Sequence, residues 1–168
     1  MTPILDDHTL EFISRSPSQT QRLGARLGGL MQGGDVICLE GTLGSGKTCL
    51  AQGIGRGWGI GQTLISPTYV LVREYTRPVD SVRLYHVDLY RVSNVDETIS
   101  LGIDESLGET EAVFVIEWAE RARPLIPRDH LWVKLDFANR THRALYFAAE
   151  GSRHKTLLEA FRHTAFGA

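Results

Sequence analysis

The sequence predicts an α/β fold: a three-layer sandwich in which helices cover a mixed sheet with a parallel centre and antiparallel hairpins. Three observations predict this fold. Two short, nearly continuous apolar runs, DVICLE (35–40) and AVFVIEW (112–118), are typical of strands that are covered on both faces. A glycine-rich loop joins the first run to a helical pattern, and strand-like segments occur in pairs around short turns. We expect the 168 residues to form one domain, residues 1–168.

A strand and a helix are expected to begin the chain. The segment TLEFIS (9–14) has the composition of a short strand. In the helical pattern that follows, Ser16 suits the N-cap position, Pro17 the first helical position, and Gln19 the place of a capping-box partner. Leucines then recur on one helical face until a glycine pair ends the element.

A second helix is expected from about Lys47 to Arg56, with Gly55, Gly57 and Gly59 ending it. Next in the chain we expect paired strands at 66–76 and 81–92 around RPVD, and then an acidic helix at 96–108. The strand at 112–118 follows, and RPLIP (123–127) breaks the chain. The last expected elements are a strand pair at 131–150 around ANRT and a closing helix at 153–163. Helices interleaved with strands of both kinds favour the mixed α/β arrangement.

Composition and charge exclude several classes of protein. Hydrophobic residues make up 42% and charged residues 23% of the chain, which is typical of a globular protein and too apolar for disorder. A net charge of −2 argues against a general binder of DNA or RNA, which carries a clear basic excess. No apolar run has the roughly 18–20 residues of a membrane helix, and the acidic N-terminus does not resemble a signal peptide. We therefore expect a cytoplasmic protein without a membrane or DNA partner.

Charge is unevenly distributed along the chain. Residues 88–119 contain eight acidic residues and one basic residue, whereas residues 120–168 contain nine lysines or arginines and five acidic residues. A solvated surface accounts for most of this pattern, and an acidic side and a basic side that face partners are the alternative. Reversing the charges of Arg121, Arg143 and Arg153 would test the alternative.

The eight residues GTLGSGKT (41–48) match the motif G-x-x-x-x-G-K-[ST] in full, between a strand pattern and a helix pattern. A phosphate chain must lie against consecutive backbone N–H groups, so Gly41, Gly44 and Gly46 stand where side chains would intrude. Lys47 is placed to reach the β and γ phosphates, and the hydroxyl of Thr48 is a suitable Mg²⁺ ligand. The expected nucleotide-binding residues are Gly41, Thr42, Leu43, Gly44, Ser45, Gly46, Lys47, Thr48 and Cys49. The motif in this context predicts a P-loop NTPase-like fold.

Two carboxylates follow other predicted strands. Glu117 ends an apolar run and is a candidate catalytic residue and Mg²⁺ ligand, with a simple strand-end carboxylate as the alternative. Asp88 ends YHVD and would hold the attacking water or the metal, or else form a turn. We interpret His86 as a packed, hydrogen-bonded strand histidine rather than a ligand. Trp118 by itself is interpreted as a core residue, with an aromatic side chain that senses the nucleotide as the alternative. The hydroxyl-bearing segment SPT (66–68) is a candidate switch that meets the γ-phosphate.

Taken together and in this order, GTLGSGKT, SPTY, HVDLYR and VIEWAER resemble the motifs of the TsaE family, the small P-loop ATPases of bacterial tRNA threonylcarbamoyladenosine biosynthesis. The likeness runs from about Thr9 to the C-terminal hairpin, nearly the whole chain. The resemblance implies a mixed α/β P-loop fold, ATP and Mg²⁺ as cofactors, and weak hydrolysis by the isolated protein. It also implies that the protein supports repeated turnover by the TsaB–TsaD pair and meets tRNA only indirectly, through that complex.

The resemblance carries roles over to individual positions. It implies a phosphate-binding lysine at Lys47, a magnesium-binding hydroxyl at Thr48, an active-site aspartate at Asp88 and a Walker B-like acid at Glu117. Switch or partner-coupling roles are implied for Ser66, Thr68, Arg91 and Trp118. One position departs from the family, which usually has an acidic residue where this chain has Thr42. Because the loop binds through backbone N–H groups, nucleotide binding is expected to survive, whereas a partner contact or charge tuning by that acid is not carried over.

Two other functions share these motifs. A small-molecule kinase would combine the same loop with arginines such as Arg121 and Arg123, but it needs an acceptor pocket and a lid, and no long insertion here resembles a lid. A nucleotide-gated scaffold would need Asp88 and Glu117 for binding but not for turnover. Alanine variants of both, with affinity measured apart from hydrolysis, would separate the scaffold from the ATPase.

Overall fold

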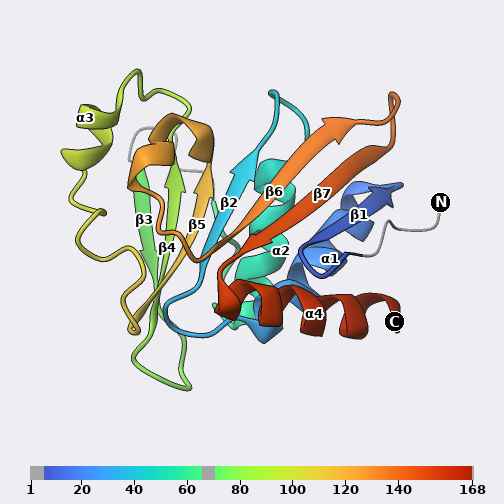
Figure 1. Cartoon of the computed structure of the whole chain (residues 1–168), viewed down its shortest axis with the longest axis horizontal. Helices are drawn as coiled ribbons and strands as arrows, with labels where there is room; N and C mark the ends of the chain where they lie inside the picture. The colour runs from blue at the N-terminus through green and yellow to red at the C-terminus, as the bar shows by residue number, and fades with distance from the viewer. Residues whose placement is uncertain (1–5, 66–70, 168) are drawn as a thin grey trace.

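The computed structural model describes residues 6–65 and 71–167, whose strands form a seven-stranded sheet in the order β1-β7-β6-β2-β5-β4-β3 (Figure 1). The strands are β1 (Thr9–Ser14), β2 (Val36–Glu40), β3 (Val72–Tyr75), β4 (Arg83–Asp88), β5 (Ala112–Glu117), β6 (His130–Phe137) and β7 (Arg143–Glu150). The helices are α1 (Pro17–Leu30), α2 (Lys47–Trp58), α3 (Val95–Ile99), the 3₁₀ element η1 (Ala119–Leu125) and α4 (Ser152–Phe166). Within these two ranges, no helix has both the length and the apolar character that crossing a membrane requires.

The sheet is parallel at its centre and antiparallel towards both edges, as the sequence predicts. β2 lies between β5 and β6 and runs parallel to both, and β4 runs parallel to β5. β3 pairs with β4, β7 with β6, and β1 with β7, all in antiparallel fashion. Because parallel strands end at the same edge of a sheet, the register places Leu39 of β2, Glu117 of β5 and Asp88 of β4 next to one another. We call this edge the carboxyl edge.

Apolar layers cover the centre of the sheet on both faces. On one face α1, α2 and α4 pack around the buried side chains of Leu27, Ile54 and Phe161. On the other face the cover comes from η1 and from the connection that contains α3, around Val92 and Ile103. Since β2 and β5 are buried on both faces, their sequences are continuous apolar runs rather than alternating patterns.

Glycines allow α1 and α2 to pack with their backbones in contact. A Cβ atom on Gly28 of α1 would lie 2.1 Å from a carbonyl oxygen of α2, and one on Gly57 of α2 would lie 1.9 Å from a carbonyl oxygen of α1. α2 continues to Trp58, so Gly55 and Gly57 lie inside it. Only Gly59, with φ 107°, ends the helix. The prediction that all of these glycines end the helix was wrong because Gly57 serves the contact between helices.

The acidic segment 96–108 forms a much shorter helix than predicted. α3 spans only Val95–Ile99, and the side chain of Asn94 caps it by accepting a hydrogen bond from the backbone N–H of Glu97 at 3.0 Å. The chain then continues in turns, where Gly102 and Gly108 have positive φ values of 72° and 85°. Backbone in this left-handed region cannot continue a right-handed helix, so the helical pattern ends early.

A partly buried polar cluster lies at the opposite, amino edge of the sheet. The guanidinium of Arg153, in the first turn of α4, donates two hydrogen bonds to Asp35, which precedes β2, at 2.9 and 2.7 Å. Nε2 of His154 accepts a hydrogen bond from the backbone N–H of Val36 at 3.0 Å, so Nδ1 carries the proton and donates it to Asp129 at 2.5 Å. Burial lowers the pKa of His154, while the carboxylates of Asp129 and Asp35 act in the opposite direction. We call Asp35, Asp129, Arg153 and His154 the amino-end cluster.

Candidate functional site

The glycine-rich loop connects the carboxyl end of β2 to the first turn of α2. Gly44 and Gly46 have φ values of 81° and 105°, a conformation that strains residues with a side chain. A Cβ atom on Gly41 would lie 2.4 Å from the carbonyl oxygen of Leu135 and 2.5 Å from Oγ of Ser45. Glycine is therefore needed at these places either for the backbone turn or for close packing, and the loop leaves the start of α2 open to a cavity.

The side chain of Lys47 is buried and points back across the loop. Its Nζ donates hydrogen bonds to the carbonyl oxygens of Gly41 at 2.5 Å and Thr42 at 3.0 Å. It also lies 4.2 Å from the centre of the Trp118 ring. Burial lowers the pKa of Lys47, while nearby carboxylates act in the opposite direction. The ammonium group is thus held by neutral acceptors, which a phosphate oxygen can replace with a stronger, charge-assisted hydrogen bond.

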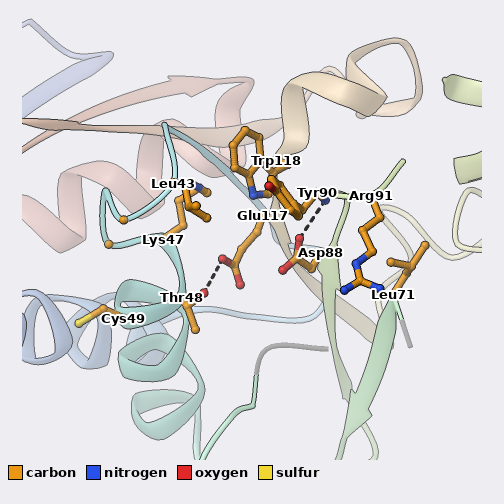
Figure 2. Close-up of a pocket in the computed structure, with 12 residues that line it drawn as sticks. Leu43, Lys47, Thr48, Cys49, Leu71, Asp88, Tyr90, Arg91, Glu117 and Trp118 are labelled. Atoms are coloured by element: carbon orange, nitrogen blue, oxygen red, sulfur yellow. Dashed lines mark hydrogen bonds between the residues drawn. The ribbon is translucent and has the colours of Figure 1, made fainter. Parts of the chain in front are cut away.

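Two carboxylates lie side by side at the ends of β4 and β5. Asp88 and Glu117 are partners in the sheet register, and both line the cavity in front of the loop. Figure 2 shows the hydroxyl of Thr48 directed at Glu117, whose Oε1 accepts its hydrogen bond at 2.7 Å. Oδ1 of Asp88 accepts a hydrogen bond from the backbone N–H of Tyr90 at 2.9 Å (Figure 2). Asp88 therefore both shapes the turn after β4 and faces the cavity.

The histidine of β4 lies behind Glu117. His86 is completely buried, and its Nε2 lies 2.6 Å from Oε2 of Glu117. His86 is packed and hydrogen-bonded, as the sequence favours, but its partner is the candidate catalytic carboxylate. Thr48, Glu117 and His86 form a hydrogen-bonded chain from the start of α2 into the core. We call Lys47, Thr48, His86, Asp88 and Glu117 the carboxyl-end cluster.

Trp118 turns the chain immediately after Glu117. Its φ of 59° is the one positive φ among the non-glycine residues that the structure describes. The centre of its ring lies 5.1 Å from that of Tyr90, and 4.9 Å from the guanidinium carbon of Arg121. Arg121 also donates hydrogen bonds to backbone carbonyl oxygens just after β4, which ties that segment to η1. The interpretation of Trp118 as ordinary core is therefore incomplete, because its ring packs on the core and also walls the cavity.

The loop, the carboxylates and Trp118 surround a cavity of about 410 Å³ (Figure 2). Residues that the sequence singled out make up most of its lining: Leu43, Gly44, Gly46, Lys47, Thr48, Cys49, Asp88, Arg91, Glu117 and Trp118. Leu71 and Tyr90 complete it and were not predicted. The position of Tyr90, two residues after the candidate Asp88, could have indicated that it lies at the site, whereas nothing in the sequence distinguishes Leu71 from other apolar strand residues.

The other predicted residues lie elsewhere. Gly41 and Thr42 border a smaller cavity of about 210 Å³, which Trp118 also lines, and Ser45 is buried beneath the loop. Ser66 and Thr68, the candidate switch residues, lie outside the described residues. The larger cavity therefore gathers the loop and the carboxylates but leaves the switch prediction open.

The lining has the donors and acceptors for a nucleotide phosphate chain with a divalent cation. The loop and the start of α2 offer backbone N–H groups, and Lys47 offers its ammonium group. Thr48, Glu117 and Asp88 offer the oxygen ligands that Mg²⁺ prefers. In the described part of the chain no group of three or more His, Cys, Asp or Glu residues is arranged to hold a metal ion. A Mg²⁺ ion here would therefore need phosphate oxygens and water as further ligands.

The arginines that the sequence suggested for charge reversal are engaged inside the fold. Arg153 belongs to the amino-end cluster, and Arg121 holds backbone carbonyl oxygens near the cavity. Arg143 donates a hydrogen bond of 3.3 Å to the backbone of the glycine-rich loop. Reversing these charges would break internal contacts, so the exposed residues Arg128 and Arg140 are better probes of a basic docking surface.

Comparison with known proteins gives consistent matches over most of the chain. The family described as threonylcarbamoyl adenosine biosynthesis protein TsaE matches residues 14–145. The tRNA threonylcarbamoyladenosine biosynthesis protein TsaE of Bacillus subtilis (strain 168) is 33% identical over 150 residues, which cover 89% of this chain and 92% of that protein. The protein of the same name from Mycobacterium leprae (strain TN) is 40% identical over 124 residues, which cover 70% of this chain and 76% of that protein.

A solved structure extends the likeness to three dimensions. The crystal structure of Bacillus subtilus YdiB matches this fold with a TM-score of 0.76 and 29% sequence identity, covering 92% of this chain and 95% of that chain. The family match at residues 14–145 includes β2 with its loop, β4 with Asp88 and β5 with Glu117. By its motifs, its sequence and its fold, this chain belongs to the TsaE family.

Proposed function

We propose that this protein is the ATP-binding and ATP-hydrolysing subunit of the machinery that makes N6-threonylcarbamoyladenosine in tRNA. In this proposal it is a cytoplasmic, Mg²⁺-dependent ATPase that is weak alone, supports multiple turnover by a TsaB–TsaD pair, and meets tRNA indirectly through that complex. The names of its relatives support the pathway. One observation carries the activity: Lys47 and Thr48 of the loop line a single cavity together with Asp88 and Glu117.

Each side chain has a defined part in the proposed reaction. Lys47 leaves its loop carbonyl oxygens and binds the β and γ phosphates. Thr48 and Glu117 would hold Mg²⁺, which when bound neutralises charge on the phosphates. Both oxygens of Glu117 are already hydrogen-bonded, to Thr48 and to His86. In this proposal Asp88, which ends β4 beside Glu117 and lines the cavity, accepts a hydrogen bond from the attacking water.

The decisive experiment counts modified tRNA molecules in a reconstituted reaction. The reaction contains the TsaB–TsaD pair, tRNA, threonylcarbamoyl-adenylate, ATP and Mg²⁺, with either this protein, its Lys47→Ala variant or its Lys155→Ala variant. Lys155 lies on α4, so it serves as a matched control for loss of a lysine. We expect many rounds of modification with the intact protein and with Lys155→Ala, and a single round with Lys47→Ala. Equal counts for all three would refute the proposed role.

A nucleotide-gated scaffold is the alternative that shares this cavity. If the protein acts by binding alone, Asp88→Ala and Glu117→Ala will change ATP affinity and tRNA modification in parallel. If it is an ATPase, Asp88→Ala will retain most of the ATP affinity while hydrolysis and repeated modification are lost. The kinase alternative has less support, because Arg121 is held by backbone carbonyl oxygens and by the Trp118 ring instead of lying on a mobile lid.

A further inference from the structure

We propose that His86 is a positioning residue of this site: its imidazole fixes the orientation in which Glu117 meets the hydroxyl of Thr48. The proposal rests on the ATPase function proposed above and adds a residue that the motifs do not assign. His86 is fully buried behind Glu117 and is not among the residues that line the cavity. Its influence on a bound nucleotide must therefore pass through Glu117.

The hydrogen bonds of Glu117 determine which tautomer His86 adopts. Oε1 of Glu117 accepts the Thr48 hydroxyl at 2.7 Å, and Oε2 lies 2.6 Å from Nε2 of His86. An ionised carboxylate can only accept hydrogen bonds, so Nε2 carries a hydrogen and donates it. The terminal torsion of a glutamate side chain is broad, and one hydrogen bond alone would leave its second oxygen loosely placed. With both oxygens bound, the carboxylate plane is fixed.

The other ring nitrogen argues against a purely structural histidine. Nδ1 of His86 is buried and has no hydrogen-bond partner among the described residues. Leaving a buried polar atom without a partner costs about 1–3 kcal/mol, which an apolar side chain at this place would avoid. His154 in the amino-end cluster shows the contrast, because both of its ring nitrogens are bonded. The hydrogen bond to Glu117 is thus the polar contact that explains why a histidine stands at this buried position.

Two substitutions of His86, each of which keeps an amide nitrogen in the place of a different ring nitrogen, test the proposal. In His86→Gln the side-chain amide nitrogen can take the place of Nε2 and donate to Glu117, whereas in His86→Asn it takes the place of Nδ1 and cannot reach. Loss of a partner that orients a metal ligand typically lowers activity or metal affinity by about 10–100-fold. We expect ATP hydrolysis, and the Mg²⁺ dependence of ATP-analogue binding, to stay near wild type in His86→Gln and to fall by that factor in His86→Asn. Binding without Mg²⁺ should be the same in both. Equal hydrolysis and equal Mg²⁺ dependence in the two variants would overturn the proposal.

A second measurement needs no variant and covers the case in which one of them folds poorly. In protein labelled with ¹⁵N-histidine, NMR of the imidazole nitrogens should show the His86 proton on Nε2 and a bare Nδ1. A proton on Nδ1 with a bare Nε2 would overturn the proposal whatever the variants do. Absence of ATP hydrolysis by the wild type with its partners would instead remove the proposed function, while the NMR result would still decide the hydrogen bond.

Discussion

The carboxyl and amino edges of the sheet each bury a histidine against a carboxylate, and they differ in what lies beyond that pair. At the amino edge, Arg153 binds Asp35, and His154 binds both Asp129 and a backbone N–H group. Every one of these partners belongs to the protein itself. At the carboxyl edge, the chain from His86 through Glu117 ends at a cavity of about 410 Å³.

This contrast separates a structural polar cluster from a candidate site. Burial and charge are common to both edges, so neither property identifies function by itself. The carboxyl-end cluster differs because, among the described residues, the hydrogen bonds of Lys47 go to neutral oxygens and its ammonium group lies against an aromatic ring. A ligand can replace these contacts. In the amino-end cluster Arg153 already forms an ion pair with Asp35, so a ligand anion would have to replace a charged partner instead of a neutral one. A buried cation whose neutral hydrogen-bond partners a ligand can replace, and which lines a cavity, therefore distinguishes the candidate site from a structural cluster.

The largest expected effect comes from removing the exchangeable cation. Lys47→Ala should weaken ATP binding about a hundredfold, because hydrogen bonds to charged groups contribute about 1.5–3 kcal/mol each. The thermal unfolding midpoint should change little, since burial already disfavours the ammonium group. Titration with a fluorescent ATP analogue and a thermal melt measure the two quantities, with Lys155→Ala as the control. Unchanged ATP affinity in Lys47→Ala would show that the carboxyl-end cluster is no more a binding site than the amino-end cluster.

The opposite result is expected at the amino edge. Asp35→Asn should lower the free energy of unfolding by about 2 kcal/mol, less than the loss of a fully buried pair, because Arg153 is partly exposed. For a domain of this size that corresponds to a midpoint lowered by roughly 4–8 °C. ATP affinity of the folded protein should not change. A matching loss of ATP affinity would show that the amino-end cluster is not purely structural.

Acid should weaken the amino edge through His154. Burial lowers the pKa of His154 in the folded protein, so the unfolded state binds the proton more readily. The stabilising contribution is therefore complete above about pH 6.5, the ordinary histidine value, and is lost as the pH falls below it. Denaturant unfolding over a pH series measures this dependence. In His154→Asn the dependence should be weaker, and an identical slope in both proteins would contradict the assignment to His154.

The smallest expected effect on stability comes from the exposed basic residues after η1. Arg128→Glu with Arg140→Glu should change the free energy of unfolding by no more than about 0.5 kcal/mol. If the basic C-terminal part docks on a partner, binding to the TsaB–TsaD pair should weaken severalfold at low salt and lose salt dependence. Arg56→Glu, an exposed reversal on α2, is the control. Equal binding by all variants would discard the basic docking surface.

Local requirements explain how much of the fold and site the sequence could predict. The motif GTLGSGKT is local: Gly44 and Gly46 meet a demand of their own backbone, and Lys47 and Thr48 have side chains that suit phosphate and Mg²⁺, so the loop could be located from the sequence alone. Asp88 and Glu117 could each be assigned to the site because each ends an apolar run, and their position side by side follows from the parallel pairing of β4 and β5 in the structure. The parallel centre and the antiparallel hairpins followed from the apolar runs and the turn signals, whereas the order of the strands across the sheet was not predicted.

Contacts between distant residues explain what could not be predicted. His86 and Glu117 are 31 positions apart, and Arg153 and Asp35 are 118 apart. No local pattern marks such pairs, so His86 looked like any strand histidine and the amino-end cluster was missed. The same holds for Gly57, whose neighbour is the backbone of another helix. The acidic segment was predicted as one helix, but Gly102 and Gly108 adopt positive φ values, which a right-handed helix cannot contain.

The glycine contact between α1 and α2 has a consequence for the order of folding. α2 contains Gly53, Gly55 and Gly57, and each glycine costs a helix about 1 kcal/mol relative to alanine. We therefore expect α2 to be largely unstructured until α1 is present for it to dock against. During synthesis α1 leaves the ribosome first, then β2, the loop and α2, and the strands that carry Asp88 and Glu117 come later. Both sheet neighbours of β2, the strands β5 and β6, are also synthesised later, so the glycine-rich loop gains its place in the sheet only together with Glu117.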